Sequence, residues 1–184
     1  MTKKYLFIYA VLFAVGVAAR LVPHPANFTP VGAIMLFGGF YFSGISRRWG
    51  WLAFLPVLFV SDAVLGFYDW RLMLAVYGSF LVMSLWGVGL GNNYSYRGAL
   101  TRVIGGSFSF FAITNFAVWA LSSWYPHTLA GLLLCYELAL PFFRASLAGD
   151  LVFGAAIFGV YSLAMARYGI LKEHDTKPHE YSIL

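Results

Sequence analysis

Charged residues are scarce in this chain of 184 residues, where Asp, Glu, Lys and Arg together contribute only 10%. A soluble domain carries roughly a quarter charged residues, so this composition excludes an ordinary soluble protein. Hydrophobic residues make up 61% of the chain, and the mean hydropathy is +0.76. The sequence therefore predicts an all-α integral membrane protein. The net charge of +5 gives no reason to expect nucleic-acid binding, because membrane proteins keep excess Lys and Arg for orientation.

Cysteine is limited to Cys135, which excludes an internal disulfide. The sequence also contains no phosphate-binding loop, no paired-histidine metalloprotease motif and no nucleotide-binding motif. We therefore predict that the protein is not an enzyme and has no bound metal or cofactor. The alternative is an intramembrane enzyme that uses either His24 with Asp62 or the thiol of Cys135.

The hydrophobic runs predict a bundle of about six transmembrane helices, because each span needs ~20 apolar residues. The runs cover residues 5–22, 30–45, 50–67, 72–91, 103–124 and 142–168. A further apolar piece, residues 129–140, is too short to span and ends at Pro141, so we expect a short re-entrant or interfacial helix there. Residues 1–171 would then form a single transmembrane domain, and residues 172–184 would form a polar cytoplasmic tail.

The distribution of Lys and Arg predicts the orientation of the bundle. With six spans and a cytoplasmic N-terminus, the inner segments hold Lys3, Lys4, Arg47, Arg48, Arg97, Arg102, Arg167, Lys172 and Lys177, and the outer segments hold Arg20, Arg71 and Arg144. This asymmetry follows the positive-inside bias, so both termini are predicted to be cytoplasmic. The first run follows two lysines, as a secretory signal does, but we interpret it as the first span.

The segment of residues 20–30 connects the first two hydrophobic runs and contains three prolines. Proline lacks an amide donor and restricts the residue before it, so a continuous helix is excluded here. The polar side chains of the segment include Arg20, His24 and Asn27. A rigid linker with such side chains is suited to hold a ligand at a membrane face. The alternative is a solvated turn between two helices.

Polar side chains also lie within the predicted spans, in the halves nearer the outer side. Ionisable groups inside a membrane are costly and usually face the bundle interior or a wet cavity. We therefore predict an outward-facing polar and aromatic substrate pocket formed by Arg20, His24, Asn27, Asp62, Asn115, Trp119, Arg144 and Asp150. The alternative is that Asp62 and Asp150 pair with Arg20 and Arg144 only to fasten the helices together.

Small residues recur at every fourth position of the first run, as Ala10, Ala14 and Ala18. Such a stripe lets another helix approach closely. It predicts an interface for a partner helix, although packing within the bundle would use the same pattern.

Five stretches carry a resemblance to known proteins: residues 20–30, Ser61–Asp62, Ile113–Phe116, Cys135–Tyr136 and Pro141–Asp150. Together they resemble an uncharacterised bacterial family of six-span proteins proposed to act in transport, and the likeness runs along most of the chain. The short spans, the alanine stripe and the outer pocket also resemble the substrate-binding S-components of energy-coupling-factor vitamin transporters.

Within that group the chain is similar to the solitary vitamin B12 transporters, with His24, Asp62 and Arg144 in comparable places. It departs from them in residues 73–80, which lack the cysteine that those proteins present to cobalt. The resemblance implies a multi-pass transport protein of the bacterial cytoplasmic (inner) membrane. That protein would capture a vitamin-like small molecule, with corrinoids among the candidates, and move it into the cytoplasm.

The resemblance also implies that a transmembrane coupling protein with ATPases docks on the alanine stripe. Beyond that partner we expect contacts with the small-molecule substrate and the lipid bilayer, and none with nucleic acid. The alternative function is that of an accessory structural subunit of a larger membrane protein complex.

Overall fold

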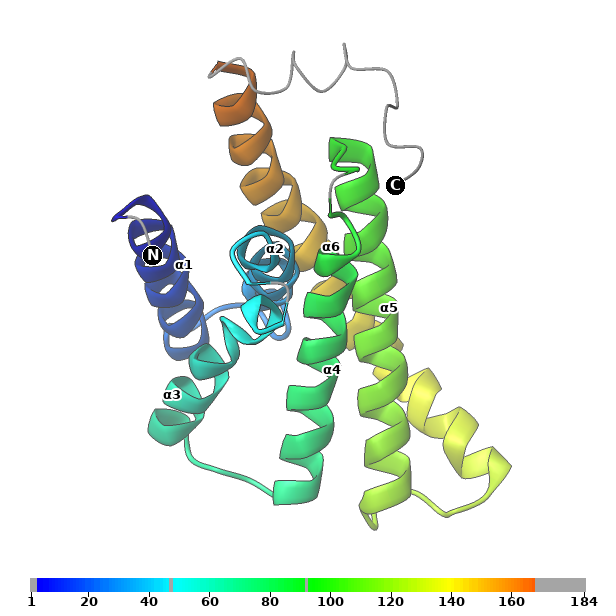
Figure 1. Cartoon of the computed structure of the whole chain (residues 1–184). Coiled ribbons are helices and arrows are strands. Elements are labelled where there is room, and N and C mark those ends of the chain that lie inside the picture. The colour runs from blue at the N-terminus through cyan, green and yellow to red at the C-terminus, as the bar shows by residue number, and fades with distance from the viewer. Residues whose placement is uncertain (1–2, 47, 92, 168–184) are drawn as a thin grey trace.

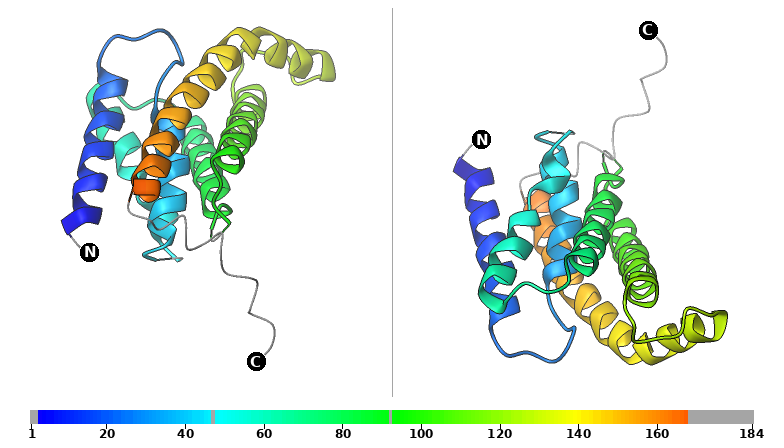
Figure 2. Two further views of the ribbon diagram at one scale, coloured as in Figure 1. Left: turned by 90° about the horizontal axis from the view of Figure 1, so that it is seen from above. Right: turned by 90° about the horizontal axis from the view of Figure 1, so that it is seen from below.

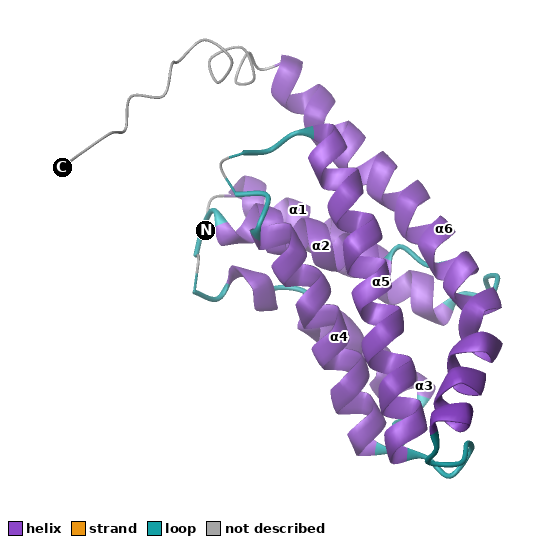
Figure 3. Cartoon of the chain, turned by 90° about the vertical axis from the view of Figure 1, so that its right-hand side faces the viewer, coloured by secondary structure: helices purple, strands orange, loops and turns teal. Residues whose placement is uncertain are grey.

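A computed structural model describes residues 3–46, 48–91 and 93–167, and all regular structure within these residues is helical (Figure 3). The elements are α1 (Lys3–Leu21), α2 (Val31–Ser43), the short 3-10 helix η1 (Gly50–Leu52), α3 (Leu55–Leu65), α4 (Trp70–Val88), α5 (Tyr96–Leu121) and α6 (Leu129–Arg167). The prediction of an all-α helical bundle is therefore confirmed for the described residues. The predicted tail, residues 172–184, lies outside them.

Three helices, α4, α5 and α6, are long and apolar enough to cross a membrane. The remaining apolar stretches are shorter, at residues 5–21, 31–43 and 50–65. Each is below the ~20 residues that a perpendicular span requires. The architecture is thus compatible with a membrane protein, and the number of six spans stays a prediction.

Helix α2 forms the centre of the bundle. Every residue from Val31 to Gly39 is buried, and the helix packs against α4, α5 and α6. A helix that is apolar on all sides avoids water only if other helices surround it, which is the place that α2 has taken. Two glycines bring α2 and α4 into backbone contact, because a Cβ on Gly39 would overlap the Ser84 carbonyl and one on Gly87 would overlap the Leu36 carbonyl.

Helix α1 packs beside α3 on the other side of α2. Its inner face presents Gly16, where an added Cβ would lie 2.9 Å from a methyl group of Val57, so this pair of helices also depends on a small residue. The opposite face of α1 is exposed and includes Ala10, Ala14 and Ala18. The alanine stripe is therefore not used for packing within the described part of the chain.

Helix α6 runs without interruption through Pro141. The prediction that residues 129–140 form a separate helix ending at this proline is wrong. Proline removes only one amide donor and clashes with one preceding carbonyl, so a long helix can continue past it with a change of direction. Figure 2 shows this change of direction along α6.

The ends of the helices fall into two groups (Figures 1 and 2). The N-terminal end of α1 and the C-terminal end of α6 lie at the same end of the bundle, together with the connection between α4 and α5. Arg48, Arg97, Arg102 and Arg167 belong to elements or loops at this end. The loops of residues 22–30, 66–69 and 122–128 lie at the opposite end. An even number of passes, as in the six-span prediction, requires this placement of the two ends.

Candidate functional site

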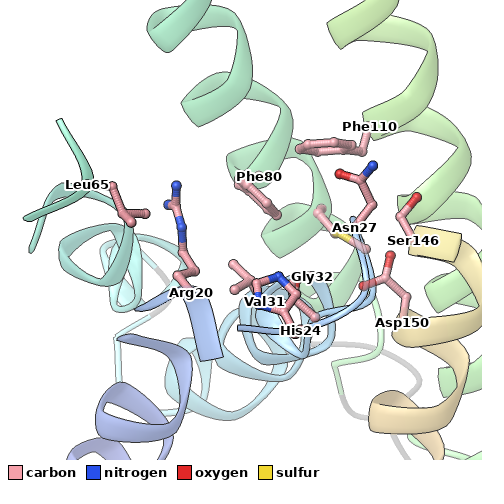
Figure 4. Close-up of a pocket in the computed structure, with 12 residues that line it drawn as sticks. Arg20, His24, Asn27, Val31, Gly32, Leu65, Phe80, Phe110, Ser146 and Asp150 are labelled. Atoms are coloured by element: carbon pink, nitrogen blue, oxygen red, sulfur yellow. The ribbon is translucent and has the colours of Figure 1, made fainter. Parts of the chain in front are cut away.

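A cavity of about 330 Å³ lies where the linker of residues 22–30 meets the bundle (Figure 4). Its walls come from the linker and from every helix except η1. The lining residues are Arg20, His24, Asn27, Thr29, Val31, Gly32, Leu65, Phe80, Met83, Phe110, Ser146 and Asp150. Because His24 and Asn27 are exposed, the cavity opens to the outside of the molecule at the linker.

The linker is held in place at both ends. Its first part continues the last turn of α1 through a bond from the Val22 amide to the Ala18 carbonyl, 2.9 Å long. Its last part packs on α6. A Cβ added to Gly149 of α6 would lie only 3.1 Å from the Thr29 nitrogen. The ring centroids of Phe28 and Phe153 lie 5.5 Å apart.

Between these ends the linker turns sharply. Asn27 has a φ of 62°, a left-handed conformation that asparagine adopts more readily than most residues. The Nδ1 atom of His24 lies 2.7 Å from the Val22 carbonyl, so Nδ1 carries a hydrogen and donates it to this carbonyl. The proline-rich linker therefore places these two polar residues at the mouth of the cavity.

Arg20 forms an ion pair with Asp62 at one side of the cavity. The Nη2 atom lies 2.5 Å from Oδ1 of Asp62, and Tyr77 donates a hydrogen bond of 2.7 Å to Oδ2. The side chain of Asp62 is 2% exposed and that of Arg20 is 20% exposed. Arg20 belongs to α1, Asp62 to α3 and Tyr77 to α4, so these bonds join three helices. Another nitrogen of Arg20, Nη1, is buried without a partner among the described residues.

Asp150 lies on the other side of the cavity and is 7% exposed. Ser107 of α5 donates a 2.6 Å hydrogen bond to its Oδ2 atom. Its Oδ1 atom lies against the first turn of α2, where a Cβ on Gly32 would overlap it, and the Ala33 amide also interacts with the carboxylate. The N-cap residue of α2, Pro30, has no side chain that could accept from the first amides of this helix. Asp150 thus meets the partial positive charge of a helix N-terminus.

The other walls of the cavity are apolar. Phe80 of α4 and Phe110 of α5 lie with ring centroids 4.6 Å apart. Met83 and Val31 are almost completely buried beside them. A small ligand in this cavity would therefore meet aromatic and aliphatic surface together with a few fixed polar groups, as in most small-molecule sites.

The structure brings together five of the eight residues that the sequence predicts for the pocket. Arg20, His24, Asn27 and Asp150 line the cavity, and Asp62 joins it through its contact with Arg20.

The other three, Asn115, Trp119 and Arg144, do not line it. Asn115 donates to the Phe111 carbonyl of its own helix, Trp119 donates to the Pro126 carbonyl in the following loop, and Arg144 is exposed.

Helix rotation explains why two of these residues, Asn115 and Arg144, are absent from the cavity. Phe110 marks the cavity face of α5, and a residue five positions later is turned by about 140° at 3.6 residues per turn. Asn115 consequently points elsewhere. Ser146 marks the cavity face of α6, and Arg144, two positions earlier, is turned away by about 200°.

Sequence reasoning missed Tyr77 and Ser107, which bond the two buried carboxylates, and the ring pair of Phe80 and Phe110. In a chain with 18 Phe and 12 Tyr, no local pattern distinguishes a cavity-lining ring from a packing ring. Ser146 is indicated by the sequence, because it lies one helical turn before Asp150.

No group of three or more His, Cys, Asp or Glu side chains that could hold a metal ion occurs in residues 3–46, 48–91 and 93–167. Cys135 is buried, and its Sγ atom lies 3.4 Å from the Asn115 carbonyl. It therefore lies with Asn115 in the contact between α5 and α6, away from the cavity lining.

Comparison with known proteins identifies one sequence family. The sequence model of DUF6580, a family of unknown function, matches residues 1–174. No curated protein matches the chain, and no solved structure matches it.

Proposed function

The chain belongs to the DUF6580 family, and we propose that it is a membrane transport protein that captures a small polar molecule in the cavity and moves it across the membrane. The observation that carries this proposal is the cavity itself. It combines buried charged groups, apolar walls and a proline-rich linker that carries polar side chains at the mouth. A backbone stiffened by three prolines loses little entropy on binding, so the arrangement favours ligand capture.

The size of the cavity favours a modest ligand. Its volume of about 330 Å³ lies near the lower limit of sites for drug-sized molecules, which is ~300 Å³. A vitamin of one or two rings fits this volume. A corrinoid is a much larger macrocycle, and it would require the linker and the adjoining helices to move apart.

The location and direction of transport follow from the same proposal. Three helices that could cross a membrane, with the excess of Lys and Arg near the two ends of the chain, support a place in the bacterial inner membrane with both ends cytoplasmic. The cavity would then open on the outer side, and the molecule would be taken up into the cell.

Energy for uptake would come from a partner. The sequence has no nucleotide-binding motif, and the exposed stripe of Ala10, Ala14 and Ala18 offers a close-packing surface to a transmembrane coupling protein that works with ATPases. Accessory membership of a larger complex would use the same exposed face, but it would leave the built cavity without a role.

The proposal is tested by mass spectrometry of small molecules that remain bound to the purified protein, and by thermal shifts with a panel of vitamins. Phe110→Trp enlarges a side chain of the cavity wall and should remove the retained molecule and the shift. Phe108→Trp is the matched control, because Phe108 is on the same helix and 60% exposed, and it should behave like the wild type.

The proposal fails if the wild-type protein retains no molecule and no vitamin shifts its melting temperature. It fails also if Phe110→Trp binds the same molecule as tightly as the wild type does. Stable association with one membrane protein in the absence of any small ligand would support the accessory subunit instead.

A further inference from the structure

The charged groups around the cavity do not cancel. The titratable and charged side chains in its lining are Arg20, His24 and Asp150. Arg20 is compensated by Asp62, with which it forms an ion pair. Asp150 has no Lys, Arg or His nitrogen within 4.0 Å among the described residues. A single carboxylate therefore remains without a cationic partner.

The protein compensates the charge of Asp150 only in part. Ser107 donates one hydrogen bond, and the first turn of α2 supplies the partial charge of a helix N-terminus, which is about half an elementary charge. Asp150 is 7% exposed, so water contributes little. A buried carboxylate is stable in its charged form when a full positive charge and further donors accompany it.

The neighbouring walls suit a particular kind of cation. Phe80 and Phe110 present aromatic surface, and the faces of aromatic rings attract organic cations. An inorganic cation would instead need several oxygen ligands at short distance. Asp150 is the only acidic side chain in the lining of this cavity. His24 places its second ring nitrogen, Nε2, at the mouth of the cavity, because Nδ1 is bonded to the Val22 carbonyl.

Resting on the proposed transport function, we infer that the cavity selects organic cations. A protonated amine or a similar nitrogen cation lies against Asp150, and the apolar part of the molecule lies against Phe80 and Phe110. Figure 4 shows Asp150 with Asn27 and Ser146 at one side of the cavity and Arg20 at the other. The ion pair of Arg20 with Asp62 keeps the positive charge of Arg20 from repelling such a ligand.

Three probes of one ring and different charge test this inference: benzylammonium, benzyl alcohol and benzoate. Their binding to the purified full-length protein is measured by calorimetry and thermal shift at neutral pH. The wild type should bind benzylammonium about tenfold to a hundredfold more tightly than benzyl alcohol, the range expected of a hydrogen bond to a charged partner. Benzoate should bind most weakly.

Asp150→Asn should remove most of this preference and change benzyl alcohol binding by less than about threefold, since only the charge-assisted part of the interaction is lost. Asp69→Asn is the matched control, because Asp69 is an exposed carboxylate that already has Arg71 as its partner, and it should leave all three affinities unchanged. If Asp150→Asn does not fold, the order of the three probes on the wild type decides the inference.

Two results would overturn the inference. One is a wild type that binds benzyl alcohol or benzoate as tightly as benzylammonium, or that binds none of the three. The other is an Asp150→Asn protein with an unchanged preference for the cation. A neutral or anionic molecule that is retained by the purified protein and lost in Phe110→Trp would refute the cation selectivity while leaving the transport proposal intact.

Discussion

Removing Arg20 from its ion pair with Asp62 should destabilise the protein more than removing both residues together. Arg20→Leu leaves the carboxylate of Asp62, 2% exposed in its side chain, with only the hydrogen bond from Tyr77. Breaking a buried pair in this way costs about 3–5 kcal/mol, because a charge stays buried without compensation. Asp62→Leu leaves Arg20, which is 20% exposed. Its long side chain can move toward water, so we expect about 2 kcal/mol.

The double variant with leucine at both positions removes the charges together. Replacing a whole buried pair by apolar residues is often neutral or stabilising, so this variant should be more stable than Arg20→Leu by about 2 kcal/mol or more. Tyr77→Phe removes one hydrogen bond to a charged group and should cost about 1.5 kcal/mol. The order of stability is then wild type, Tyr77→Phe, Asp62→Leu and Arg20→Leu, with the double variant above the last.

Equilibrium unfolding in mixed detergent micelles measures these differences, with thermal melting as a second reading. The four proteins of the cycle give the coupling energy between positions 20 and 62 directly. Additive costs, with the double variant less stable than either single one, would refute the view that the pair stabilises the bundle by mutual compensation of buried charge. Equal costs for the two single variants would refute the expectation that the more exposed Arg20 tolerates the loss of its partner better than Asp62 does.

Three further predictions concern other parts of the molecule. Gly87→Ala should cost at least about 2 kcal/mol of unfolding free energy, because its Cβ would overlap the Leu36 carbonyl and force α2 and α4 apart; an unchanged melting temperature would contradict the backbone contact. Ala14→Trp should leave folding and ligand retention unchanged, since Ala14 is exposed, but should abolish uptake if a partner helix docks there; unchanged uptake would remove the stripe from the proposal. The hydrogen bond from Arg71, with the backbone amide of Leu72, holds the pKa of Asp69 below its ordinary value. Its stabilising effect is therefore present above the usual pKa of Asp and lost as the pH falls through the lowered pKa, so Asp69→Asn should be less stable than the wild type at neutral pH and equal to it in acid. Unfolding measured across pH would contradict this if the difference were constant.

The two buried aspartates differ in a way that their sequence surroundings do not reveal. Asp62 and Asp150 both follow apolar helical segments and both were predicted as pocket residues. In the folded chain Asp62 accepts hydrogen bonds from Arg20 and Tyr77. Asp150 instead accepts a hydrogen bond from the Ser107 hydroxyl and lies against the N-terminus of α2. The alternative role of fastening helices therefore applies to Asp62. Asp150 remains available to a ligand.

The sequence by itself determined the helical class, the approximate ranges of the helices before α6 and the position of the linker. These properties depend on local causes: long apolar runs favour helices that avoid water, and the prolines of residues 20–30 exclude a continuous helix. The linker also placed Arg20, His24 and Asn27 at one end of the bundle, because residues so close in the chain cannot lie far apart.

Only the tertiary structure decided which side chains from different helices meet. The rotation of each helix about its axis is set by packing, as where Gly39 and Gly87 bring α2 and α4 into contact. A turn of about 100° per residue moves a side chain from the cavity to another helix or to the surface. For this reason Phe110 lines the cavity while Asn115 does not, and Arg20 reaches Asp62 across 42 positions of the chain, which no local pattern encodes.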